Sequence, residues 1–177
     1  MLTEEEILIL VDDADVEIGS EGKMQVHLQG LLHRAFSVFL WDDGGRLLLQ
    51  RRAEVKYHSP GLWANTCCGH PRLGEDTATA AHRRLFEELG TRSQLLHHGT
   101  YAYRSHVGEL VENEFVHLFS GRYSGTADPN PDEISELRWI EPADLIAEFE
   151  AAPHAFSAWF GHYIKDIPLQ SLRPSPA

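Results

Sequence analysis

Lysine is scarce in this chain, and acidic side chains outnumber basic ones. Only three lysines occur, Lys23, Lys56 and Lys165, and the formal net charge is −12. Nucleic acids are bound by basic surfaces that neutralise their phosphates. The composition therefore argues against a nucleic-acid partner. An anionic substrate would have to be held by a few cations focused in one cleft, together with metal ions.

Cysteine and long apolar runs are also nearly absent. The two cysteines, Cys67 and Cys68, are adjacent, which makes an ordinary disulfide between them geometrically unfavourable and fits a reducing compartment. Residues 1–10 mix glutamates with an apolar run that is too short for a membrane span and lacks the basic flank of a signal peptide. We therefore expect a soluble, cytoplasmic protein without membrane insertion.

The length of 177 residues predicts one domain with a sizeable core. We expect residues 1–177 to form this domain, with the core at about 20–165 and residues 1–19 and 166–177 peripheral. Alternating and apolar runs predict strands over 7–11, 24–28, 32–41, 46–51, 99–106, 110–119 and 137–140. Asp42-Asp43-Gly44-Gly45 predicts a hairpin that joins 32–41 and 46–51 as a buried antiparallel pair, Gly108 marks another hairpin, and residues 19–22 mark a turn.

Three segments are expected to be helical: residues 76–90, a stretch that begins near Pro142, and residues 156–164. In the first, Asp76 or Thr77 can cap the start and Gly90 suits the position after the end. Its expected buried stripe is Ala78, Ala81, Leu85 and Leu89, with Arg84 and Glu88 on one flank, and Arg83 and Glu87 pointing away. The expected fold class is α/β, a mixed sheet covered by helices.

The segment from Gly69 to Gly90 carries a recognisable pattern, Gly69-x5-Glu75-x7-Arg83-Arg84-Leu85-x-Glu87-Glu88-x-Gly90. It resembles the Nudix box, with two departures. Arg84 stands where Nudix hydrolases carry a metal-holding glutamate, and Thr91 stands where an aliphatic residue is usual. A cation in place of an anion beside a divalent metal reverses the local electrostatics, so the departure argues against ordinary Nudix hydrolysis.

Flanking motifs narrow the resemblance. They are Pro60-Gly61-Leu62-Trp63 with Asn65, Cys68-Gly69-His70-Pro71, Glu112-Asn113-Glu114 and Ala155-Phe156-Ser157-x-Trp159. Together they look like type I isopentenyl diphosphate isomerase, a branch of the Nudix superfamily, over about residues 20 to 165. The resemblance implies a Nudix-like single domain, a mixed sheet sandwiched by helices. It also implies a metal-dependent isomerase that interconverts isopentenyl and dimethylallyl diphosphate in isoprenoid biosynthesis.

The resemblance implies a divalent metal held by His27, His33, His70, Glu112 and Glu114. Residues at i and i+2 on a strand share a face, so Glu112 and Glu114 point the same way, either as solvated carboxylates or around a cation. The ligand types suit Mn²⁺, Zn²⁺ or Mg²⁺. The interval from His27 to His33 is one residue shorter than the family pattern implies. Either the loop with Gly30 closes differently or His27 is displaced, which makes His33 and His70 the firmer ligands.

The remaining roles also follow from the resemblance. Lys23, Arg52, Lys56 and Arg84 match its diphosphate-binding cations, Trp63 is expected at the substrate, and Glu88 with the Cys68 main-chain carbonyl matches a second site, for Mg²⁺ that accompanies the diphosphate. Cys68 matches the catalytic cysteine, with Glu114 as the opposed acid/base group and Tyr103 in support. Trp159 is expected to cover the carbocation, since a desolvated cation–π contact is worth ~2 kcal/mol or more. Cys67 is expected only to pack.

Two other readings remain open at this stage. One is a Nudix hydrolase that cleaves a diphosphate linkage, which Arg84 disfavours. The other is a non-catalytic binding protein, which has no use for an acid/base pair. The expected partner is a small isoprenyl diphosphate, and the sequence leaves the oligomeric state open.

Overall fold

Strand β3 (His33–Trp41) joins the other parts of the sheet in the computed structural model, which describes residues 6–56 and 58–175. β3 pairs in parallel with β8 along its whole length and antiparallel with β1, β4 and β6. The remaining strands are β1 (Ile7–Val11), β2 (Glu17–Gly22), β4 (Leu47–Arg52), β5 (Trp63–Ala64), β6 (Cys67–Gly69), β7 (Leu95–Val107), β8 (Leu110–Arg122) and β9 (Ile134–Ile140). The described residues thus form a mixed sheet of nine strands.

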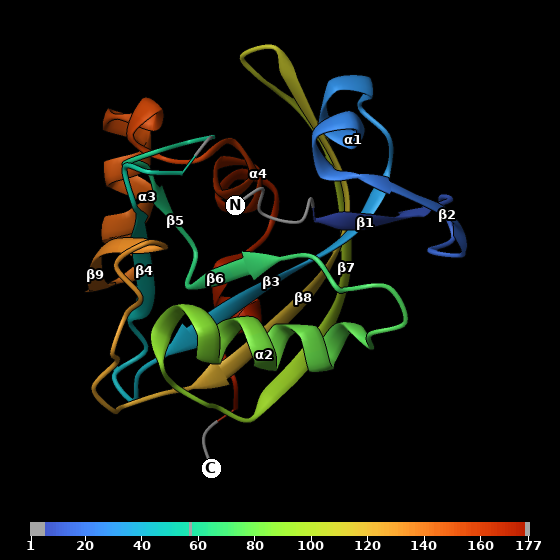
Figure 1. Cartoon of the computed structure of the whole chain (residues 1–177). Coiled ribbons are helices and arrows are strands. Elements are labelled where there is room, and N and C mark those ends of the chain that lie inside the picture. The colour runs from blue at the N-terminus through green and yellow to red at the C-terminus, as the bar shows by residue number, and fades with distance from the viewer. Residues whose placement is uncertain (1–5, 57, 176–177) are drawn as a thin grey trace.

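Helices cover both faces of this sheet (Figure 1). They are α1 (Lys23–Gln29), α2 (Thr77–Leu89), α3 (Pro142–Ala151) and α4 (Ala158–Asp166), with 3₁₀ turns at Pro153–Ala155 and Leu169–Leu172. On one face, Phe36, Val38 and Leu40 of β3 pack under α2. On the other, Phe39 and Trp41 pack against α3 and α4. The alternation of β3 side chains therefore builds two cores, one on each side, and the predicted α/β architecture is confirmed.

Helix α2 has the predicted caps. The Asp76 carboxylate accepts a hydrogen bond from the Thr79 N–H at 3.0 Å. Gly90 takes the left-handed conformation (φ 63°), and its N–H donates to the Phe86 carbonyl. The buried stripe differs by one position, because Ala80 is fully buried and Ala78 only partly. α3 begins at Pro142 as predicted, and α4 lies two residues later than predicted.

Two predictions near the amino terminus are wrong. Residues 24–28 alternate like a strand, but they lie in helix α1, which buries the adjacent pair Val26 and His27 and leaves Met24 exposed. Adjacent buried residues suit a short helix packed at one spot, whereas a strand would send them to opposite faces. The predicted turn at residues 19–22 lies instead in β2, which pairs with β1.

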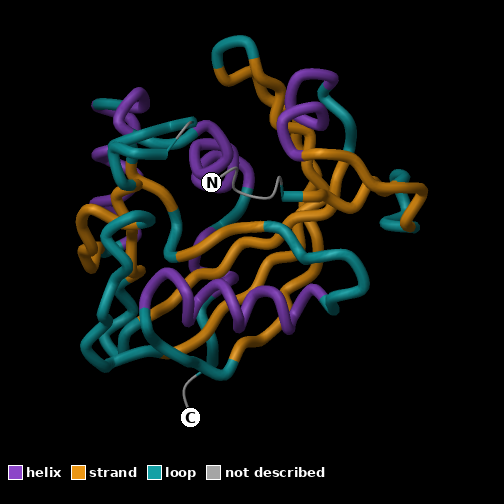
Figure 2. The backbone as a smooth tube through the Cα atoms, in the orientation of Figure 1, coloured by secondary structure: helices purple, strands orange, loops and turns teal. Residues whose placement is uncertain are grey.

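The two predicted hairpins have different outcomes. The β7–β8 hairpin turns at Gly108 (φ 63°), as predicted. The turn between β3 and β4 also forms, with Asp42 accepting from the Arg46 N–H at 2.8 Å. The predicted antiparallel pair is nevertheless reduced to Trp41 opposite Leu47, because β3 continues along β8 while β4 pairs with β9. The tube in Figure 2 shows β4 diverging from the central strands in this way.

Candidate active site

Three adjacent strands send site residues to one face of the sheet. On one side of β3, Ser37 is paired with Cys68 of β6. On the other side, His33 is paired with Glu114 of β8. Paired residues on neighbouring strands share a face, and so do residues four apart on one strand. Cys68, His33 and Glu114 therefore emerge together, whereas Cys67 points the other way and packs in the core beneath α2.

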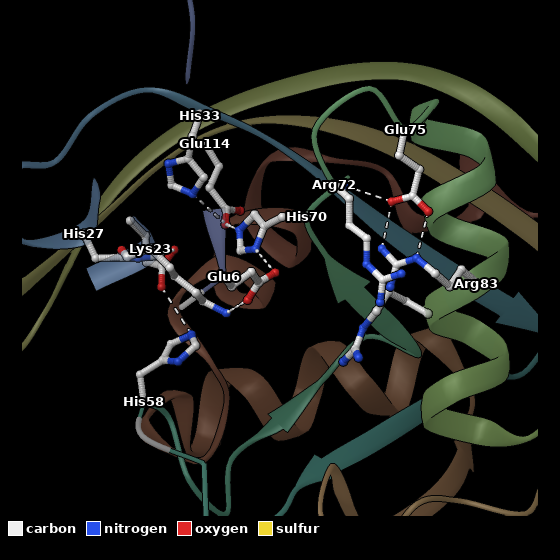
Figure 3. Close-up of polar contacts among 12 residues, drawn as sticks. Glu6, Lys23, His27, His33, His58, His70, Arg72, Glu75, Arg83 and Glu114 are labelled. Atoms are coloured by element: carbon white, nitrogen blue, oxygen red, sulfur yellow. Dashed lines mark hydrogen bonds and ion pairs between the residues drawn. The ribbon is translucent and has the colours of Figure 1, made fainter. Parts of the chain in front are cut away.

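Three imidazoles converge beside this face. Ligand atoms of His27, His33 and His70 all lie within 4.8 Å of one another, and so do those of His33, Glu112 and Glu114. Figure 3 shows His27, His33, His70 and Glu114 turned toward a common centre. His27 is thus not displaced by its short interval to His33. Instead, Gly30 ends α1 in the left-handed conformation, and the chain returns at once to β3.

Hydrogen bonds to main-chain carbonyls orient two of these rings. His27 Nδ1 lies 2.7 Å from the Lys23 carbonyl oxygen, and His33 Nδ1 lies 2.9 Å from that of Leu31. A carbonyl only accepts, so the proton belongs on Nδ1 and the lone pair on Nε2. His27 Nε2 lies 3.3 Å from Glu112 Oε2. The pattern of an anchored Nδ1–H and a free Nε2 is the one that metal-ligating histidines show.

The donor set fits a divalent metal ion. His33 Nε2 is buried without a hydrogen-bond partner, and its nearest carboxylate oxygen, on Glu114, is 3.6 Å away, too far for a hydrogen bond. A buried polar atom without a partner is costly, and a cation at the centre would satisfy it. Imidazole nitrogens and carboxylate oxygens together suit Mn²⁺, Zn²⁺ or Mg²⁺. The cluster can therefore hold a divalent metal.

Glu114 connects this cluster to Tyr103. The Tyr103 hydroxyl donates to Glu114 Oε2 at 2.8 Å, and His70 Nε2 lies 3.2 Å from Glu114 Oε1. Burial raises the pKa of the Glu114 carboxyl, but the neighbouring imidazoles, including the hydrogen bond with His70, lower it well below its ordinary value. Glu114 is therefore an ionised carboxylate, and the raised pKa of Tyr103, due mainly to burial, keeps that phenol protonated.

Cys68 is a protonated thiol. Burial raises the pKa of Cys68 to about 12, the guanidinium of Arg52 lowers it in part, and the carboxylates of Glu88 and Glu114 raise it further. A thiol with a pKa in this range keeps its proton at neutral pH. Cys68 and Glu114 thus offer one protonated and one unprotonated group to the same cavity.

The cavity has a volume of about 240 Å³, which suits a small molecule. Most of the residues that the sequence predicted for the site line it, namely Lys23, Arg52, Lys56, Cys68, His70, Arg84, Glu88, Glu112, Glu114 and Trp159. His27, His33 and Tyr103 lie directly behind, in contact with Glu112 or Glu114. The structure therefore brings together residues that lie far apart in the sequence, from Lys23 in α1 to Trp159 in α4.

Cations and carboxylates alternate along the wall beside α2. The Lys56 ammonium lies 2.5 Å from Glu133, and the Arg84 guanidinium contacts Glu88 at 2.5 Å and Glu133 at 3.2 Å. Burial lowers the pKa of Arg84, but the surrounding carboxylates raise it above its ordinary value. Burial raises the pKa of Glu88 more than Arg84 lowers it. A phosphate group can replace a carboxylate as the partner of Lys56 or Arg84 in this wall.

Two tryptophans expected at the site have different positions. Trp159 lines the cavity, with the Arg52 guanidinium 5.1 Å from its ring centroid, and its Nε1–H donates to Asn65. Trp63 is not among the described residues that line the cavity. Its ring packs elsewhere, with its centroid 4.2 Å from the guanidinium carbon of Arg138. The expectation that Trp63 meets the substrate is therefore not supported by its position.

Sequence reasoning missed several residues of the cavity wall. Arg83 and Glu87 also line the cavity, although their angular positions on the helix predicted otherwise, and Arg83 holds Glu75 at 2.7 Å. Glu6, His58 and Glu133 line it as well. Each comes from a segment with no local pattern that points to a site, so only their spatial neighbours identify them.

Comparisons with known proteins agree with this site. The family model for the NUDIX domain matches residues 31–160. Isopentenyl-diphosphate delta-isomerase 1 of Aromatoleum aromaticum is 51% identical over 156 residues, which are 88% of each chain. The isopentenyl-diphosphate delta-isomerase of Burkholderia multivorans is 50% identical over 95% of this chain and 96% of the relative. The isopentenyl-diphosphate delta-isomerase of Streptomyces coelicolor is 49% identical over 89% of this chain and 82% of the relative.

Solved structures support the fold. The DR0079 protein of Deinococcus radiodurans superposes with a TM-score of 0.77 at 22% identity, over 90% of this chain and 98% of the other. The MutT protein of Methanosarcina mazei superposes with a TM-score of 0.64 at 17% identity, over 80% of this chain and 96% of the other. At such identities the likeness concerns the fold alone. With the NUDIX match and the relatives at about half identity, it follows that the chain belongs to the isopentenyl-diphosphate delta-isomerases of the Nudix superfamily.

Proposed function

We propose that this enzyme interconverts isopentenyl and dimethylallyl diphosphate with Cys68 and Glu114 as its acid/base pair. The observation that carries the proposal is that Cys68 and Glu114 line one cavity, where the pKa of the thiol is raised and that of the carboxyl is lowered. The isomerisation adds a proton to the terminal alkene carbon, which creates a tertiary carbocation, and removes a proton from the neighbouring methylene. One group gives a proton and the other takes one, so the pair keeps the same number of protons.

The divalent metal would be held by His27, His33, His70, Glu112 and Glu114. When bound, the ion would supply a fixed positive charge beside Glu114. Mn²⁺, Zn²⁺ and Mg²⁺ all suit these ligands. Tyr103 orients Glu114 by donating a hydrogen bond to its Oε2, which keeps that carboxylate aimed at the cavity.

The diphosphate would bind at the wall beside α2. Lys23, Arg52, Lys56 and Arg84 line the cavity and can each make a charge-assisted contact with phosphate oxygens. Glu88, with the Cys68 carbonyl, would hold Mg²⁺ that accompanies the diphosphate. The overall charge of the chain is thus compatible with an anionic substrate, because the cations are concentrated locally.

Trp159 would stabilise the carbocation. Its ring already lies within cation–π distance of the Arg52 guanidinium, so its face is accessible to positive charge from the cavity side. Trp159 is only 4% exposed, so its ring offers a largely dry surface to a carbocation in the cavity.

Isoprenoid biosynthesis is the pathway that this chemistry would serve, with a small isoprenyl diphosphate as the partner. Within residues 6–56 and 58–175, no helix is long and apolar enough to cross a membrane. The cytoplasmic location remains a prediction from the sequence.

The decisive experiment incubates the protein with isopentenyl diphosphate in deuterated water. The expected product is dimethylallyl diphosphate carrying deuterium in a methyl group, detected by mass spectrometry, with Cys68→Ala as the inactive control. Release of phosphate or diphosphate without isomerisation would instead support a Nudix hydrolase. Binding without any turnover would support a non-catalytic role.

A further inference from the structure

The three imidazoles of the metal cluster are anchored in different ways. The Nδ1 atoms of His27 and His33 face main-chain carbonyls, which their own local backbone supplies. The Nδ1 atom of His70 faces the side chain of Glu6, with 3.6 Å between His70 Nδ1 and Glu6 Oε1. This distance is that of an ion pair rather than a short hydrogen bond. The orientation of one metal ligand is thus coupled to a carboxylate more than sixty residues away in the chain.

Glu6 is held in place through its main chain and its other carboxylate oxygen. Its carbonyl accepts a hydrogen bond from the Lys23 N–H at 2.8 Å, and Glu6 Oε2 lies 2.6 Å from the Lys23 ammonium. The next residue, Ile7, is paired with Gly22 in the β1–β2 ladder. Figure 3 shows the resulting bridge from Lys23 through Glu6 to His70.

A carboxylate that lines a cavity proposed to take a diphosphate needs a cationic or imidazole neighbour, since like charges repel. Glu6 has both kinds of neighbour: its Oε1 lies 3.6 Å from His70 Nδ1, and its Oε2 lies 2.6 Å from the Lys23 ammonium. A carboxylate beside Nδ1 of a histidine favours the proton on that nitrogen and leaves Nε2 free for a metal. On the other side, it holds the ammonium of Lys23 at the cavity wall.

We propose that Glu6 is a positioning residue of the active site, which orients His70 for the metal with one carboxylate oxygen and holds Lys23 for the diphosphate with the other. The part that concerns Lys23 rests on the proposed function. The part that concerns His70 depends only on the metal cluster. Glu6, which lies in the stretch expected to be peripheral, is thereby a working part of the site.

Metal affinity provides the test. Mn²⁺ is titrated by calorimetry into metal-depleted wild-type protein, Glu6→Ala and Glu6→Gln. Loss of a carboxylate that supports a ligating histidine typically weakens metal binding about 10- to 100-fold, and this is the result expected for Glu6→Ala. Glu6→Gln keeps an acceptor oxygen but not the charge, so its affinity should fall between the other two. Equal affinities in all three proteins would overturn the proposal.

Glu133→Ala is the matched control. Glu133 pairs with Lys56 at 2.5 Å, much as Glu6 pairs with Lys23 at 2.6 Å, but within the described part of the chain its ion-pair partners are Lys56 and Arg84 and not an imidazole of the cluster. Its Mn²⁺ affinity should therefore match that of the wild type. A loss as large as that of Glu6→Ala would show that any carboxylate at the cavity affects the metal, and would reject a specific role for Glu6.

A spectroscopic readout separates positioning from a merely structural role. ¹⁵N chemical shifts of the His70 ring report which nitrogen carries the proton, and we expect the Nδ1–H form to lose population in Glu6→Ala. The Glu6 side chain is 47% exposed, so its truncation should leave no buried cavity and little change in thermal stability. An unchanged His70 tautomer would contradict the proposal. Both measurements omit substrate, so a failure of isomerisation would leave them interpretable.

Discussion

The two ends of the cavity hold charge out of water in opposite ways. At the metal end, Glu112 and Glu114 face imidazoles whose Nε2 atoms are free to bind, so a metal cation would complete the arrangement. At the end proposed for the diphosphate, Lys56 and Arg84 already have carboxylate partners in Glu88 and Glu133. A metal ion would thus be added at the first end, whereas a phosphate at the second end would replace a carboxylate that already pairs with a cation. Substitutions should therefore affect the two ends through different measurements.

Cys68→Ala should have the largest effect on turnover, because it removes one of the two proposed acid/base groups. Loss of one acid/base group typically lowers kcat about 10²- to 10⁴-fold, and the same loss is expected here with metal content unchanged. Steady-state kinetics with metal analysis check this. The control is Cys67→Ala, which lies on the opposite face of the sheet and should keep most of its activity. If the two variants exchanged behaviour, the assignment of the thiol would be wrong.

Alkylation of Cys68 should depend steeply on pH. Because its pKa is raised to about 12, the thiolate is the minor form throughout the neutral range and grows as pH rises. In chelator-treated protein, the rate of modification by iodoacetamide should rise about tenfold per pH unit from pH 7 to 10, without a plateau. Mass spectrometry of the Cys68 peptide measures this rate. A plateau near pH 7 would mean that cationic groups outweigh burial at this thiol.

His33→Ala removes one imidazole of the metal cluster and leaves the cations beside α2 unchanged. The variant should lose metal, with affinity lowered at least about 10- to 100-fold and activity lowered in proportion, because a buried ligand is removed. Metal analysis by mass spectrometry is the measurement. The short interval to His33 makes His27 the weaker candidate ligand by sequence, but His27 is 1% exposed and lies within the cluster, so a comparable loss is expected for His27→Ala. Full metal occupancy in both variants would rule out the site.

Arg84→Ala tests the diphosphate end. If Arg84 exchanges Glu88 for phosphate, its removal should cost on the order of 2 kcal/mol of substrate binding and raise KM about 30-fold. If it is only an ion pair at the surface of α2, the loss would be about 0.3–0.5 kcal/mol of stability with no kinetic effect. Kinetics on Arg84→Ala and Arg84→Glu distinguish these cases. Hydrolysis by Arg84→Glu would show that this charge separates isomerase from hydrolase.

Local patterns in the sequence were sufficient for features that depend on near neighbours. Asp76 and Gly90 mark the ends of α2 because capping satisfies main-chain groups within one turn. Glu112 and Glu114 share a face because a strand has a period of two. The motifs around Cys68 and Trp159 led to the family, and the relatives confirm it. None of these inferences requires knowledge of which strands pair.

Only the tertiary structure decided what depends on pairing between distant segments. The parallel pairing of β3 with β8 places His33 beside Glu114, where the sequence favoured β4 as the partner of β3. Residues 24–28 alternate like a strand, yet packing of Val26 and His27 at one spot makes them helical. Glu6 reaches His70 because β1 pairs with β2 and brings it to the start of α1. Register between separated segments depends on the packing of the whole sheet, which no local period encodes.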